Sequence, residues 1–175
     1  NDARNVLMKN GIKVVANNYA SSNVDMPTMP LDILSVFNND NSVVVFDVGG
    51  DDDGALALGQ YKQYFDKYGY EMHFIVNTKR PLTRTNDELI EIAERIESAS
   101  RLKFTDIYNN TNLSDQTDET TLFSGYDEIK MLSKKMGIVI KKNCGIDKAL
   151  SNVPTNLKDT VFRMNICILI PWEIQ

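Results

Sequence analysis

A run of apolar residues at 42–48 is followed by two glycines and three consecutive aspartates. Asp47 lies near the end of the run, Gly49 and Gly50 come next, and Asp51 opens the acidic triplet. A carboxylate at the end of a buried strand can hold Mg²⁺, and a glycine lets a backbone N–H approach a phosphate oxygen closely. We therefore predict Asp47 and Asp51 as metal ligands and Gly49 as a phosphate contact, with Asp47 and Gly50 as catalytic positions.

The same residues also have a purely structural interpretation. Gly49 and Gly50 would make a tight turn from strand to helix, and the acidic side chains would cap a helix that begins near Gly54. Carboxylates at a helix N-terminus occupy the place that an anion would take. Phosphate binding at this turn therefore requires a metal ion between the acids and the phosphate.

Asparagines end two further apolar runs. Asn109 and Asn110 follow the run at 103–109, and Asn77 ends the run at 71–77. An amide offers both a donor and an acceptor, which suits the edge of an adenine ring, although an asparagine after a strand also serves as a turn residue. His73 is the only histidine and lies inside an apolar run, so we expect a structural role for it rather than a histidine-based metal site.

Short runs rich in Val, Ile and Phe alternate with segments of helical period, which is typical of a parallel sheet covered by helices. Strands are predicted at 12–17, 42–48, 71–77, 103–109, 137–143 and 165–170. One helix is predicted around 58–68, and another begins with the capping box formed by Thr85 and Glu88. The pattern predicts an α/β fold of three layers, with a mostly parallel sheet and helices on both faces.

The composition is that of an ordinary globular domain. The chain has 175 residues, 42% of them hydrophobic and 25% charged, which predicts a single α/β domain over 1–175. A net charge of -5 gives no electrostatic support for binding nucleic acid or an anionic membrane. Cys144 and Cys167 lack a C-x-x-C spacing, so we expect a reducing, cytoplasmic compartment and no nucleophilic role for Cys144.

Four stretches carry a resemblance: "NVDMPTMPLDILSVF", "VVVFDVGGDDDGALALGQY", "IVNTKRPLTRTNDELIEIAERIESASRL" and "IYNNTNL". The chain resembles, over nearly all its length, a bacterial group of P-loop ATPases related to the MinD/ParA division and partition proteins (the CobQ/CobB/MinD/ParA nucleotide-binding domain). This resemblance implies a P-loop NTPase-like fold with ATP and Mg²⁺ as cofactors. It also implies that Asp47 is the Walker B-type aspartate, Gly50 the switch glycine, and Asn109 or Asn110 the amide that contacts the base.

The sequence departs from that family in one respect. It contains no G-x-x-x-x-G-K-[ST] motif, and the family's first strand and glycine-rich loop would lie before residue 1. We therefore expect a fragment of a longer ATPase that binds ATP poorly and does not hydrolyse it at a useful rate. Loss of that strand would leave strand edges unpaired, which favours a homo-oligomer or a rearranged sheet. The alternative is a non-enzymatic α/β interaction domain that has lost its nucleotide chemistry.

Overall fold

The structure is a computed structural model that describes residues 2–15, 31–38, 42–49 and 52–166. The chain divides into two compact units, which are described separately. One unit comprises Asn1–Tyr70, Ser98–Arg101 and Cys167–Gln175, and the other comprises Glu71–Glu97 and Leu102–Ile166. No helix in the described part of the chain combines the length and apolar character needed to cross a membrane.

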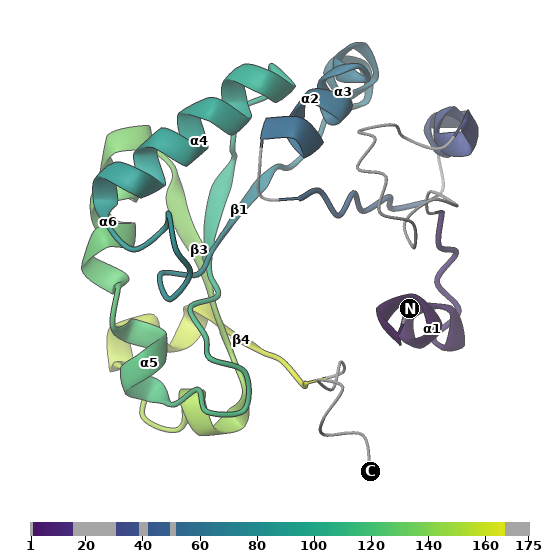
Figure 1. The fold of residues 1–175 in the computed structure, drawn as a ribbon. Coiled ribbons are helices and arrows are strands. Elements are labelled where there is room, and N and C mark those ends of the chain that lie inside the picture. The colour runs from purple at the N-terminus through teal and green to yellow at the C-terminus, as the bar shows by residue number, and fades with distance from the viewer. Residues whose placement is uncertain (1, 16–30, 39–41, 50–51, 167–175) are drawn as a thin grey trace. The chain divides into compact units, whose positions relative to one another are not determined.

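A parallel sheet of four strands forms the centre of the second unit (Figure 1). The strands follow one another in chain order: β1 (His73–Val76), β2 (Asp106–Asn109), β3 (Val139–Gly145) and β4 (Val161–Arg163). The register sets His73 opposite Asp106, and Asp106 opposite Val139. The amino ends of the first three strands are therefore aligned. A register irregularity separates Ile107 from Tyr108 in the pairing of β2 with β3.

Three helices cover one face of this sheet: α4 (Asn86–Ser100), α5 (Glu119–Phe123) and α6 (Tyr126–Met136) (Figure 1). Because the strands follow in chain order, right-handed crossovers place every connecting helix on the same face. The core between sheet and helices is formed by the fully buried side chains of Leu89, Ala93, Ile107, Leu122, Ile129 and Leu132. On the opposite face Ile75 and Val139 remain 54% and 65% exposed. The α/β class with a parallel sheet is thus present, with the described helices of this unit on one face.

Three of the six predicted strands are confirmed, because β1, β2 and β3 overlap the runs at 71–77, 103–109 and 137–143. The strands predicted at 12–17 and 42–48 are wrong over the described residues 12–15 and 42–48, which have no regular secondary structure. Val43 and Val45 are 94% and 86% exposed there, and a strand is not stable without hydrogen-bonded neighbours. The run at 165–170 lies outside the described residues except for 165 and 166, which form no strand.

The regular structure described in the first unit consists of four short helices and the last residues of α4. The four short helices are α1 (Asp2–Lys9), a 3-10 helix (Leu31–Asn38), α2 (Asp52–Gly59) and α3 (Lys62–Tyr68). The Phe37 ring stacks on Tyr64 with centroids 4.8 Å apart and meets Phe65 edge-on at 5.6 Å. Leu58 and Phe65 are buried as the helical period predicted, whereas Tyr68 is 47% exposed. Aromatic packing therefore joins the 3-10 helix to α3.

The capping box at the start of α4 is confirmed. The Glu88 side chain accepts hydrogen bonds of 2.9 Å from the backbone N–H groups of Thr85 and Arg84. In return, the Glu88 N–H donates to Thr85 Oγ1 at 3.3 Å. These bonds, first of all the one from the Thr85 N–H, hold the pKa of Glu88 below its usual value. The start of α4 is thus determined by residues three apart in the chain.

Candidate functional site

Two of the residues predicted to hold metal and phosphate, Asp47 and Gly49, belong to a described segment without regular secondary structure. Asp47 and Gly49 are both exposed there. Gly50 and Asp51 lie outside the described residues. Within the described ranges, the one group of three or more His, Cys, Asp or Glu side chains close enough to share an ion does not contain Asp47. Among the described residues, Asp47 thus belongs to no group of three possible metal ligands.

Asn109, the last residue of β2, is fully buried and engaged by protein groups on both sides of its amide. Its Nδ2 donates to the Leu122 carbonyl oxygen and to Asn143 Oδ1, each at 3.1 Å. Its Oδ1 accepts the Thr111 backbone N–H, also at 3.1 Å. Asn109 thus ties β2 to β3 and α5, and its amide groups are occupied within the fold.

Asn110 lies one residue beyond β2, and its side chain is placed differently. Its backbone N–H donates to the Val76 carbonyl oxygen at 2.8 Å, which holds it at the carboxyl end of β1. Its Oδ1 is buried and meets no hydrogen-bond donor in the described part of the chain. A buried acceptor in this state costs free energy until a donor reaches it. Of the two neighbouring asparagines, Asn110 is therefore the one that retains an amide oxygen for a ligand.

Asn77 joins the loops that follow β1 and β2. Its Oδ1 accepts the backbone N–H groups of Lys79 at 3.0 Å and Asn112 at 3.3 Å. Its Nδ2 donates to the Asn112 carbonyl oxygen at 3.2 Å. These bonds are those of a turn residue, and they hold the two loops together at the carboxyl edge of the sheet.

A hollow of about 330 Å³ lies at the carboxyl end of β1. It is lined by Thr78, Lys79, Arg84, Ser124, Gly125 and Glu128. Gly125 is the N-cap of α6, and a Cβ there would lie 2.2 Å from Thr78 Oγ1, so no larger residue fits without displacing Thr78. Two basic side chains, hydroxyl groups and the amino end of a helix line this hollow, with Glu128 as the opposing charge. The lining suits a ligand that carries anionic and hydrogen-bonding groups.

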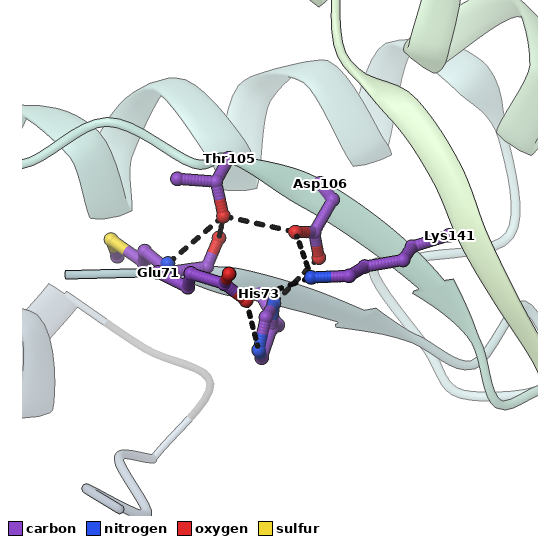
Figure 2. Close-up of polar contacts among 6 residues, drawn as sticks. Glu71, His73, Thr105, Asp106 and Lys141 are labelled. Carbon is purple, nitrogen blue, oxygen red and sulfur yellow. Dashed lines mark hydrogen bonds and ion pairs between the residues drawn. The ribbon is translucent and has the colours of Figure 1, made fainter. Parts of the chain in front are cut away.

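A second polar cluster lies at the amino ends of β1 and β2 (Figure 2). His73 Nδ1 is 2.5 Å from Asp106 Oδ1, and His73 Nε2 is 3.7 Å from Glu71 Oε2. Lys141 Nζ lies 2.7 Å from Glu71 Oε2 and 3.2 Å from Asp106 Oδ2. Four ionisable side chains from three strand regions therefore converge at one point.

The strand register builds this second cluster. His73 and Asp106 are the first residues of their strands and are paired with one another, so both side chains point to the same face. Thr105 Oγ1 lies 3.1 Å from Asp106 Oδ2 and accepts the Met72 N–H at 3.0 Å, which anchors the carboxylate. The hydrogen bond to Glu71, followed by that to Asp106, raises the pKa of Lys141 above its usual value. The cluster therefore contains a lysine that stays protonated.

The thiol of Cys144 belongs neither to the hollow at the carboxyl end of β1 nor to the polar cluster at the amino ends of β1 and β2. Cys144 is 5% exposed and lies in β3. Burial raises its pKa to about 11, with Lys142 acting in the opposite direction. Because the thiolate is the nucleophilic form, this cysteine has little reactivity at neutral pH.

Comparisons of this chain with protein-family models, with curated proteins and with solved structures give no match. What the hollow at the carboxyl end of β1 and the polar cluster at the amino ends of β1 and β2 can bind therefore follows from the chemistry of their residues.

Sequence reasoning did not identify Glu71, Asp106 or Lys141 as members of a site. The predicted bounds place Glu71 at the start of one strand but Asp106 and Lys141 inside theirs, at 103–109 and 137–143, so alignment of the predicted strand starts does not bring these residues together. The register of the folded sheet, which sets His73 opposite Asp106, assembles the cluster. The bulge that carries Lys141 into the cluster likewise has no signal in the sequence.

Proposed function

We propose that this chain is the nucleotide-binding domain of a MinD/ParA-like P-loop ATPase, with ATP as its nucleotide and helices on both faces of the complete sheet. The observation that carries the proposal is the buried amide oxygen of Asn110, which has no donor among the described residues. In open α/β sheets, ligands bind outside the carboxyl ends of the strands, which is where Asn110 lies. Its oxygen can accept a hydrogen bond from the exocyclic amine of adenine.

The hollow at the carboxyl end of β1 offers groups for the rest of the nucleotide. Lys79, Arg84 and Ser124 line it, and cations and hydroxyl groups are ligands for phosphate oxygens. The sequence has no G-x-x-x-x-G-K-[ST] motif, so the ring of N–H groups and the lysine that hold the phosphates in P-loop proteins are missing from it. We therefore expect weak ATP binding and no useful rate of hydrolysis by this chain.

The Mg²⁺ part of the proposal rests on Asp47 and Asp51. Asp47 is exposed and belongs to no described group of three possible ligands, and Asp51 lies outside the described residues. Of the two proposed metal ligands, the described residues therefore include Asp47 alone. Gly49 and Gly50 remain proposed neighbours of the phosphates on the resemblance alone.

Calorimetry with Mg·ATP on the full chain tests the proposal. We expect a dissociation constant weaker than about 0.1 mM, since micromolar affinity corresponds to roughly 8 kcal/mol and much of that comes from the missing loop. Asn110→Ala should reduce the affinity at least tenfold, whereas Asn156→Ala, at an exposed position far along the chain, should not change it. Equal affinity for wild type and Asn110→Ala would overturn the assignment of the base contact. Micromolar binding abolished by Asp47→Ala would show that the phosphate site is misplaced.

An interaction domain without nucleotide chemistry is the second candidate, and one observation favours it. Ile75, Val139 and Phe162 are each at least half exposed on strands of the second unit. β1 and β4 are also the two edge strands of its sheet, and unpaired edges favour self-association. We propose a homo-oligomer formed through these features, which light scattering can detect. The double variant Ile75→Lys/Val139→Lys should abolish assembly through the exposed sheet face but not assembly through the edge strands. A strictly monomeric wild type would exclude both modes of assembly.

A further inference from the structure

We propose that Glu71, His73 and Asp106 form a binding site for one divalent transition-metal ion, with Zn²⁺ as its representative. One ligand atom from each residue lies within 4.8 Å of the other two. An imidazole nitrogen with two carboxylate oxygens is a donor set that Zn²⁺ accepts, and three protein ligands leave a fourth position open. None of these residues belongs to the proposed nucleotide site, so the two proposals stand or fall separately.

The separation of the ligand atoms is close to what such an ion needs. With metal–ligand distances of about 2.0–2.1 Å, two ligands of a tetrahedral ion lie roughly 3.3 Å apart. His73 Nε2 and Glu71 Oε2 are already 3.7 Å apart. The Glu71 side chain is 65% exposed and can rotate inward to complete the contraction. Asp106 Oδ1 lies 2.5 Å from the other imidazole nitrogen, Nδ1, so ligation of one ion by all three residues also requires the partly exposed His73 ring to turn until one nitrogen faces both carboxylates. Both movements are rotations of side chains and leave the strands in place.

A rigid scaffold holds the other two ligands. His73 and Asp106 are paired residues at the starts of neighbouring strands, and the Asp106 side chain is only 6% exposed. Thr105 Oγ1 donates a hydrogen bond of 3.1 Å to Asp106 Oδ2, which holds the carboxylate in place (Figure 2). The supporting hydrogen bond therefore keeps the Asp106 carboxylate and both strand backbones in place while the His73 ring turns.

Without metal, the ammonium group of Lys141 is the cation that neutralises the two carboxylates. Its Nζ contacts Glu71 and Asp106, the two carboxylates of the ligand set. An incoming ion must displace this ammonium group, and the flexible lysine stem, with its side chain 37% exposed, can swing into water. Lys141 thus competes with the metal for the same oxygens. This competition separates a metal site from a simple ion-pair network, because removal of the lysine should strengthen metal binding.

Calorimetric titration of the untagged full chain with ZnCl₂ tests the proposal. We expect one Zn²⁺ per wild-type chain, affinity at least tenfold tighter in Lys141→Met, and affinity at least tenfold weaker in His73→Gln. Lys142→Met, which removes the neighbouring lysine, serves as the matched control and should bind as the wild type does. Circular dichroism of each variant checks that it is folded.

A second measurement uses the fact that His73 is the only histidine in the chain. The single imidazole Cε1–H resonance of the folded chain should shift or broaden as one equivalent of Zn²⁺ is added. Absence of saturable binding by the wild type up to about 1 mM, an unchanged resonance, or equal affinity in His73→Gln overturns the site. Weaker binding by a folded Lys141→Met overturns the displacement of the lysine.

Discussion

Replacement of Asn109 by alanine should strongly destabilise the sheet of the second unit. The substitution removes three hydrogen bonds of 3.1 Å and leaves the Leu122 carbonyl oxygen, Asn143 Oδ1 and the Thr111 N–H without this partner. Leu122, Asn143 and Thr111 are fully buried, so water cannot replace the lost bonds without entering the core. Each buried group left without its partner costs about 1–3 kcal/mol, and partial relaxation lowers the sum. We expect a loss of about 3–5 kcal/mol in the free energy of unfolding.

Urea unfolding followed by far-ultraviolet circular dichroism measures this loss. With a slope of about 1–3 kcal/mol per molar urea, the midpoint should fall by roughly 2 M. Because the chain has two units, one transition need not report on both, so hydrogen exchange of the β2 and β3 amides should accompany the measurement. Loss of protection in Asn109→Ala should be concentrated in those strands.

Two matched variants separate a structural asparagine from a ligand-binding one. Asn110→Ala removes an oxygen that has no donor in the described part of the chain, so it should change stability by less than about 1 kcal/mol. Asn143→Ala removes one of the Asn109 partners, so the two substitutions combined should cost less than the sum of the single ones. A loss of less than about 1 kcal/mol in the free energy of unfolding of Asn109→Ala would refute the structural role of Asn109. Equal destabilisation by Asn110→Ala would refute it as well.

Three further results are expected. Gly125→Ala places a Cβ 2.2 Å from Thr78 Oγ1 and should destabilise the fold by about 1–3 kcal/mol, so an unchanged Tm would contradict the packing described. In a Cys167→Ser variant, Cys144 should react with a thiol reagent at pH 8 at least tenfold more slowly than a free cysteine, because burial raises its pKa to about 11; a rate like that of an unfolded peptide would contradict this burial. Backbone N–H groups hold the pKa of Glu88 below its usual value, so the stabilisation from this carboxylate is present at neutral pH and lost as the pH falls below about 4. The decline of Tm over that range should be shallower in Glu88→Gln, and identical slopes would contradict the capping role.

Features that depend on nearby residues could be predicted from the sequence. The capping box of Thr85 and Glu88 needs only a spacing of three residues, and it forms as predicted. Apolar runs identified β1, β2 and β3, because β-branched and other apolar residues favour strands. The fully buried Leu89 and Ala93 follow from the helical period of α4 in the same way.

Features that depend on distant partners were decided by the tertiary structure. The run at 42–48 has the composition of a strand but forms no strand in the described part of the chain, because an apolar run becomes a strand only by pairing with other strands. Asn109 and Asn110 are identical in type and adjacent in sequence, so no local pattern distinguishes them. Asn109 is enclosed by groups 13 and 34 residues away, whereas Asn110, one position further, retains a buried oxygen without a donor among the described residues.

The candidate metal site of Glu71, His73 and Asp106 also combines one feature set by nearby residues with one set by distant partners. Glu71 and His73 stand two residues apart, so an extended chain places both on one side, as the sequence alone implies. Asp106 comes 33 residues after His73, and only the pairing of β1 with β2 brings its carboxylate to 2.5 Å from the imidazole. Local spacing determines which face a side chain occupies, whereas strand register determines which side chain it meets, because register is set by contacts across the whole sheet.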